Sequence, residues 1–223
     1  MSRASAAVDV TVLAGAYLVG SIPVAWMLGR RRDIELREVG SGNPGTSNLF
    51  RNAGVGAAAL SGPLQFAQGA VPVLLARAVG AEDGVIELAA VCAVVGNGWP
   101  VWLRFNGQRC VAVASGAAAG LHPALLVVLL ICFGAGALTH SIALGVLAGF
   151  SALPIVAAWL GGRGPALSCC GLLAAILLRR LEGLAGDLRA AGRGRQRGIV
   201  VRRLLLDERP GQVLVGRRTQ PRA

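Results

Sequence analysis

Residues 40–48 read GSGNPGTSN and separate two apolar segments, 7–29 and 55–79, each long enough to cross a membrane. Their backbone carries few bulky side chains, so its N–H groups can approach a ligand closely and surround an anion. Arg51 follows three residues later and adds a planar fork of donors that matches phosphate oxygens. A flexible interhelical linker is the alternative. A linker has no need of two Asn and one Arg at fixed offsets, so the order of residues favours an anion-binding loop.

Long apolar segments make up most of the chain. Of its 223 residues 54% are hydrophobic, and the mean hydropathy is +0.62. Segments near 20 residues match the ~30 Å thickness of a bilayer at 1.5 Å per helical residue. They predict an all-α polytopic membrane bundle of about seven transmembrane helices, with six as the alternative count. The segments are 7–29, 55–79, 84–103, 110–120, 121–139, 141–160 and 165–178. Residues 121–123 can form either a tight turn or a break within one helix.

Arg residues indicate the orientation of the bundle. They concentrate after the first segment, after the third segment and at the C-terminus, whereas the alternate connections hold few. The positive-inside rule therefore predicts an outer N-terminus and a cytoplasmic C-terminus, which requires an odd number of spans. Three polar, Gly-rich regions, 40–54, 96–109 and 179–187, then share the cytoplasmic side. Their convergence predicts an active site at the inner face of the membrane.

The formal net charge is +11, and all 22 basic residues are Arg, so roles that need a Lys amine are excluded. Residues 189–223 contain ten Arg against Asp207 and Glu208, which gives this tail a charge of +8. On a membrane-embedded chain we expect a partly disordered cytoplasmic tail that faces anionic lipids, and not a nucleic-acid partner. The predicted organisation is a membrane domain, 1–188, followed by the tail, 189–223. The Cys and His residues lack zinc-ligand spacing, so we expect no metal or cofactor.

Three further features accompany the 40–48 loop: Gly20-Ser21-Ile22-Pro23 in the first segment, Arg37-Glu38-Val39, and the Arg51 position. Together they resemble the opening motif of the bacterial membrane acyl-phosphate:glycerol-3-phosphate acyltransferases. The resemblance implies a seven-helix bundle in the bacterial cell membrane with its active face in the cytoplasm. It also implies transfer of a fatty acyl group from acyl phosphate to the sn-1 hydroxyl of glycerol 3-phosphate. The product would be lysophosphatidic acid, which enters phospholipid synthesis.

The resemblance also indicates site residues. Because acyl phosphate is a mixed anhydride, the enzyme must mainly position its substrates and stabilise charge. Ser41 and Asn97 are the predicted catalytic residues. The predicted phosphate-binding residues are Gly42, Asn43, Gly45, Ser47, Asn48, Arg51, Gly107 and Arg109. The alternatives are a turn hydroxyl for Ser41, a structural role in the loop for Asn48 and an interfacial cation for Arg51.

The second motif departs from the family pattern, which is Gly-His-x-x-Pro followed by Phe-x-Gly-Gly-Lys-Gly-Val-Ala-Thr. This chain reads GNGWP at 96–100 and FNGQRCVAV at 105–113. Asn97 replaces the His and cannot carry a proton near neutral pH. Arg109 replaces the Lys and keeps its positive charge. Gln108 and Cys110 replace glycines, which permit unusual backbone angles and close ligand approach. We therefore expect an altered phosphate-binding region.

Two other regions also differ from the family. Gln65 and Gln68 stand where the family has Asp-x-x-Lys, so a charged pair has become a neutral pair. Residues 179–183, RRLEG, resemble the family's Arg-Leu-Leu-x-Gly but lack its preceding Asn and His; a basic helix end explains them equally well. Two functions remain open. One is an active acyltransferase with a modified second motif, and the other is a catalytically impaired or repurposed member that binds lipid or phosphate.

Overall fold

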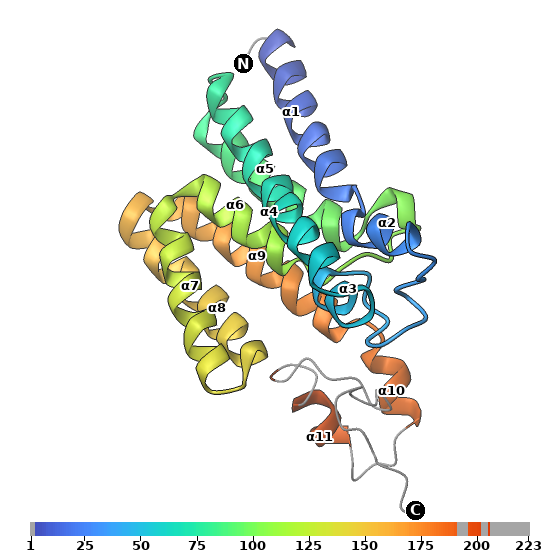
Figure 1. Ribbon diagram of the computed structural model, residues 1–223. Coiled ribbons are helices and arrows are strands. Elements are labelled where there is room, and N and C mark those ends of the chain that lie inside the picture. The colour runs from blue at the N-terminus through green and yellow to red at the C-terminus, as the bar shows by residue number, and fades with distance from the viewer. Residues whose placement is uncertain (1–2, 191–195, 202–204, 206–223) are drawn as a thin grey trace, which may run out of the picture.

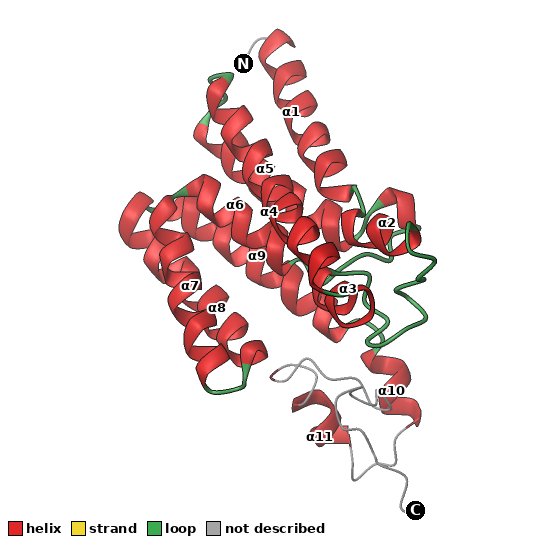
Figure 2. Cartoon of the chain, viewed as in Figure 1, coloured by secondary structure: helices red, strands yellow, loops and turns green. Residues whose placement is uncertain are grey.

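The computed structural model describes residues 3–190, 196–201 and 205, and every regular element in this part of the chain is a helix (Figures 1 and 2). The all-α prediction is confirmed there, whereas most of the predicted tail lies outside the described residues. The elements are α1 (Arg3–Ser21), α2 (Val24–Arg30), α3 (Thr46–Ala53), α4 (Val55–Ala78), α5 (Asp83–Gly98), the 3₁₀ turn η1 (Val101–Leu103), α6 (Val111–Leu121), α7 (Pro123–Leu138), α8 (Ile142–Gly161), α9 (Arg163–Leu181), α10 (Leu184–Ala190) and α11 (Gln196–Val201).

Each predicted apolar segment contains helix, but the segments differ in length. Among the described residues, four stretches are long and apolar enough to cross a membrane by length and composition: Ala6–Arg30, Val55–Ala78, Asp83–Leu103 and Ile142–Gly161. α6 and α7 are shorter apolar helices. They join through a tight turn and not through a broken helix. His122 is extended at φ −157° between them, and its Nδ1 accepts a hydrogen bond from the Ala124 N–H.

The first apolar segment is interrupted between α1 and α2, where Pro23 lacks an N–H to continue the helical hydrogen bonds. Gln68 of α4 compensates for part of this loss. Its buried amide nitrogen donates to the carbonyl oxygens of Val19 and Ile22, each at 2.8 Å. Backbone carbonyls inside a bilayer need such partners because water is absent. One of the two Gln residues that replace a charged pair therefore stabilises the helix break beside the first loop.

α5 lies at the centre of the bundle and packs against α1, α4, α6 and α9, while α7 and α8 form a hairpin beside α9 (Figure 1). Small residues bring the central helices close together. A Cβ on Gly69 of α4 would collide with the carbonyl oxygen of Val113 on α6, and one on Gly116 would collide with that of Phe66. Close backbone contact of this kind provides the van der Waals packing that holds membrane helices together.

A small second core anchors the first loop to the bundle. Leu36 from the loop and Leu49 from α3 are fully buried against Ala25 of α2 and Ala57 of α4. The loop is thus attached by apolar burial at a point just before residues 40–48. This attachment fixes the polar stretch against the end of the bundle.

Gly69→Ala tests the α4–α6 contact. Overpacking a helix interface costs about 1–3 kcal/mol, so the midpoint of thermal unfolding in detergent is expected to fall by about 2–10 °C. Gly62→Ala on the same helix is the matched control, because nothing lies within 4 Å of its added Cβ. Ala is the better helix former, so this control is expected to keep or raise the midpoint. Equal midpoints for the two variants would contradict the packing role of Gly69.

Candidate active site

Asn48 organises the first loop from inside it. Its side chain is 1% exposed, and its amide nitrogen donates to the carbonyl oxygens of Leu36 (2.8 Å) and Val39 (3.0 Å). Its amide oxygen accepts the Ser41 N–H at 3.1 Å. Asn48 therefore ties both sides of the Gly40 turn to the start of α3. These contacts support the alternative given above for Asn48, which is a structural role in the loop.

Residues 35–37, which precede the Gly40 turn, are held by an ion pair that lies over an aromatic ring. The Glu35 carboxylate accepts hydrogen bonds from Arg37 Nε (2.9 Å) and from Trp26 Nε1 (3.0 Å). The hydrogen bonds from Arg37 hold the pKa of the Glu35 carboxyl at about 2, so the pair is fully charged at neutral pH. The Arg37 guanidinium also stacks on the Trp26 ring, with 5.6 Å between its carbon and the ring centroid.

The second loop, residues 104–110, folds back onto the C-terminal end of α5. The N–H groups of Gly107 and Gln108 donate to the carbonyl oxygens of Gly98 and Asn97, each at 3.1 Å. These are carbonyls that the helix itself leaves without partners. Gly107 allows the approach, because an added Cβ would collide with the Asn97 carbonyl oxygen. The end of α5 and the second loop thus form one hydrogen-bonded unit.

Cys110 begins α6 in the left-handed region, with φ 63°. A non-glycine residue rarely adopts this backbone conformation, and this agrees with the prediction that the position suits Gly. Gln108, the other replaced glycine, is not among the described residues with positive φ. The buried Cys110 thiol lies near the carbonyl oxygens of Val94 and Gln108, at 3.5 Å from each.

Arg179, near the C-terminal end of α9, holds the second loop in place. It is 5% exposed, and its guanidinium donates to the carbonyl oxygens of Gln108 (3.0 Å) and Gly107. It also pairs with Glu182 and lies over the Trp99 ring. The third polar region therefore positions the second one through a buried charge-assisted contact.

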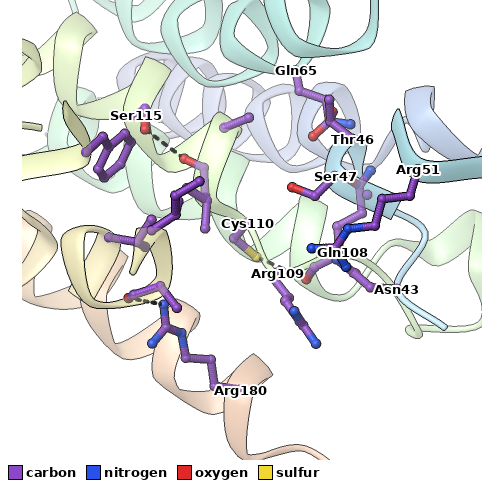
Figure 3. Close-up of a pocket in the computed structure, with 17 residues that line it drawn as sticks. Asn43, Thr46, Ser47, Arg51, Gln65, Gln108, Arg109, Cys110, Ser115 and Arg180 are labelled. Atoms are coloured by element: carbon purple, nitrogen blue, oxygen red, sulfur yellow. Dashed lines mark hydrogen bonds between the residues drawn. The ribbon is translucent and has the colours of Figure 1, made fainter. Parts of the chain in front are cut away.

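A cavity of about 440 Å³ opens where the two loops meet α4 and α6–α9 (Figure 3). This volume is in the usual range for a small-molecule site. Its described lining residues are Asn43, Gly45, Thr46, Ser47, Arg51, Gln65, Gln108, Arg109, Cys110, Val111, Ala112, Ser115, Phe133, Ile142, Ala143, Val146 and Arg180.

The cavity is cationic. Three guanidinium groups line it, those of Arg51, Arg109 and Arg180, and none of its described lining residues is acidic. Gln108 is 3% exposed, and its amide nitrogen has no hydrogen-bond partner among the described residues. A buried donor without a partner is costly unless a ligand accepts its hydrogen bond. The cavity therefore suits an anion.

The structure brings together only some of the predicted site residues. Asn43, Gly45, Ser47, Arg51 and Arg109 line the cavity. The remaining predicted residues are not among its described lining residues: Ser41, Gly42, Asn48, Asn97 and Gly107. Asn97 is 2% exposed, and its side-chain oxygen has no hydrogen-bond partner in the described part of the chain.

Several residues of the candidate site are absent from the sequence-based site prediction. Arg180, Gln65 and Gln108 line the cavity, and Arg179 holds the second loop. The sequence held a signal for two of them, since Arg179 and Arg180 sit at the end of an apolar segment. A basic helix end explained that pattern equally well, and only the tertiary structure separates the two readings.

Comparison with known proteins identifies the family. The family model described as glycerol-3-phosphate acyltransferase matches residues 10–185. The glycerol-3-phosphate acyltransferase of Geobacter metallireducens is 36% identical over 174 residues, 77% of this chain and 89% of the relative. Glycerol-3-phosphate acyltransferase 4 of Dehalococcoides mccartyi is 32% identical over 213 residues, 91% of each chain. The match to the Rubrobacter xylanophilus enzyme is 48% identical but spans 48% of this chain and 54% of that one.

The fold agrees with this relationship. A crystal structure of PlsY, an integral membrane glycerol 3-phosphate acyltransferase, in its glycerol 3-phosphate form matches with a TM-score of 0.74 and 25% identity. The match covers 82% of this chain and 92% of PlsY. The predicted resemblance is confirmed by the family match, by the relatives and by this structure. The chain is a member of the glycerol-3-phosphate acyltransferase family.

Proposed function

We propose that this chain transfers a fatty acyl group from acyl phosphate to the sn-1 hydroxyl of glycerol 3-phosphate and releases lysophosphatidic acid for phospholipid synthesis. The observation that carries the proposal is the cavity between the two loops. It combines three guanidinium groups and an unpartnered amide donor with apolar residues from α6, α7 and α8. Both substrates carry a phosphate, and one carries an acyl chain, so the lining matches their chemistry.

The reaction needs little beyond positioning and charge stabilisation. The sn-1 hydroxyl oxygen attacks the acyl carbonyl carbon, the new ester C–O bond forms, and the C–O bond to phosphate breaks. No His, Asp or Glu is among the described lining residues, and Asn97 cannot take up a proton. The hydroxyl proton therefore passes to a phosphate oxygen, whose second pKa of about 6 suits that task.

The two walls of the cavity are proposed to serve different substrates. Asn43, Ser47, Arg51 and Gln108 gather on one side, with Arg109 between them and Arg180 (Figure 3). We assign the first side to glycerol 3-phosphate. Ser41 and Asn97, which are not among the described lining residues, are proposed to support catalysis. Ser41 acts through Asn43, which lines the cavity and whose N–H donates to the Ser41 hydroxyl oxygen at 3.4 Å.

The proposal includes a membrane topology. We propose seven spans in a bacterial cell membrane, an outer N-terminus and a cytoplasmic active face that receives water-soluble glycerol 3-phosphate. The Arg-rich connection after α2 supports this orientation, since Arg30, Arg31 and Arg32 are exposed next to the first loop. Anionic lipids are the proposed partners of these cations and of the tail.

Turnover by the full chain in proteoliposomes tests the function. Acyl phosphate and glycerol 3-phosphate are expected to give lysophosphatidic acid by mass spectrometry, whereas a free fatty acid, which lacks the phosphate leaving group, gives none. Arg51→Ala is expected to lower kcat/KM by about tenfold or more, as for a lost hydrogen bond to a charged group, and Ser41→Ala is expected to lower it because Asn43 loses its contact with the Ser41 hydroxyl. A folded protein that forms no product, and that Asn97→His does not activate, would instead support a repurposed family member.

Asn48→Asp separates loop positioning from substrate binding. The carboxylate cannot donate to the Leu36 and Val39 carbonyls, so we expect a loss of about 1–3 kcal/mol and a lower midpoint of thermal unfolding. Arg51→Ala is expected to leave that midpoint within about 2 °C while it raises KM. Asn52→Asp is the matched control, because Asn52 is exposed and donates only to Asn48 among the described contacts. An unchanged midpoint of thermal unfolding for Asn48→Asp would contradict the structural role of Asn48.

Gln108→Leu tests the unpartnered amide. This variant keeps the volume of the side chain and removes its donor, so KM for glycerol 3-phosphate is expected to rise about tenfold with little change in kcat. Steady-state kinetics with acyl phosphate held at saturation give the measurement. A KM equal to that of the parent protein would mean that Gln108 fills space and does not bind the substrate.

A further inference from the structure

Arg180 occupies an unusual position for a charged residue. It lies in the last turn of α9, is 3% exposed, and lines the cavity between the two loops. Its Nη2 donates to the Ala143 carbonyl oxygen at 3.1 Å, in the first turn of α8. This hydrogen bond fixes the direction of the guanidinium toward the α8 wall of the cavity (Figure 3).

The neighbouring arginine has a different role. Arg179 points to the second loop, where it holds two carbonyl oxygens and pairs with Glu182. Consecutive residues of a helix point about 100° apart, so the two guanidinium groups serve different surroundings. Arg179 positions the backbone, whereas Arg180 is the one that lines the cavity.

Apolar residues line the same cavity as Arg180. They are Phe133 of α7 and Ile142, Ala143 and Val146 of α8, and the Ala143 carbonyl oxygen accepts the hydrogen bond from the guanidinium. Arg180 thus places a positive charge in a cavity that also has apolar lining. A guanidinium carries five N–H donors and can hold a carbonyl oxygen and a phosphate at the same time.

A charged group beside apolar lining residues matches an amphipathic ligand, which has a charged head group and an apolar chain. Acyl phosphate is such a ligand, since a phosphate is joined directly to the carbonyl end of an alkyl chain. Glycerol 3-phosphate has no apolar part, and its proposed side of the cavity is that of Arg51, Asn43 and Gln108 (Figure 3).

We propose that Arg180 binds the phosphate of the acyl donor and places the acyl chain along the α7–α8 wall. This inference rests on the proposed function for the identity of the donor. Arg180 is thus a substrate-binding residue that selects the donor, and the acceptor phosphate is held on the opposite side. The two phosphates then approach from two sides of Arg109.

Binding to the full chain in detergent tests the assignment without turnover. The probe is a long-chain acyl phosphonate, in which carbon replaces the bridging oxygen, measured by isothermal titration calorimetry. Arg180→Gln is expected to weaken its binding by about tenfold or more, whereas the affinity for glycerol 3-phosphate changes less than about twofold. Arg180→Lys keeps a charge but loses the planar fork, and it is expected to recover part of the affinity.

Arg77→Gln is the matched control. Arg77 lies in the last turn of α4 and donates to the Leu121 carbonyl oxygen at 3.1 Å, the same kind of contact outside the described cavity lining. It is expected to bind both ligands as the parent chain does. Equal weakening by Arg77→Gln and Arg180→Gln, or loss of glycerol 3-phosphate binding alone in Arg180→Gln, would overturn the proposal.

Kinetics separate this inference from the proposed function. Arg180→Gln is expected to raise KM for acyl phosphate about tenfold or more and to leave KM for glycerol 3-phosphate unchanged. A parent chain that binds the phosphonate but makes no product would refute the proposed activity, while the binding comparison still decides the role of Arg180. If Arg180→Gln does not give a monodisperse protein, Arg180→Lys carries the same comparison, and an affinity equal to that of the parent chain would overturn the proposal.

Discussion

The geometry of the cavity depends on one buried contact, that of the Arg179 guanidinium with the carbonyl oxygens of Gln108 and Gly107. Without it, the second loop would have to satisfy those carbonyls within a bundle that excludes water. With it, the loop is fixed between the end of α5 and the end of α9. Gln108, Arg109 and Cys110 then line the cavity. The cavity is thus positioned by a residue that is not among its described lining residues.

The residues that depart from the family pattern differ in how their side chains are bonded. Cys110 accepts a left-handed conformation that costs a non-glycine residue about 1–2 kcal/mol, and its buried thiol lies close to two backbone carbonyls. Gln108 fills the space beside Gly45 and offers a donor where a glycine would offer only backbone. Gln68 supports the break between α1 and α2. The Gln68 amide nitrogen and the Cys110 thiol thus contact backbone carbonyl oxygens. The Gln108 amide nitrogen and the side-chain oxygens of Gln68 and Asn97 have no hydrogen-bond partner among the described residues.

The sequence predicts the helices well and the site only in part. Apolar segments of about 20 residues identify the bundle because hydrophobicity acts on whole segments. Their interruptions were less visible: 7–29 contains the break before α2, and 84–103 ends in a 3₁₀ turn after Pro100. The first loop was found because its glycines and amides are contiguous. Arg180 was not, because its role depends on the contact with Ala143 on another helix, and no local pattern encodes that distance. For the same reason, the buried contacts of Asn48 became visible only in three dimensions.

The composition of the cavity also determines where its proton chemistry resides. Its cations are all guanidinium groups, which stay charged at any physiological pH, and its described lining holds no His, Asp or Glu. The described wall therefore supplies guanidinium groups of constant charge. In the proposed reaction the proton passes to a phosphate, and a phosphomonoester such as glycerol 3-phosphate has a second pKa of about 6. That reaction would not need a His in the second motif, because it asks the enzyme for orientation and fixed positive charge, which the arginines supply.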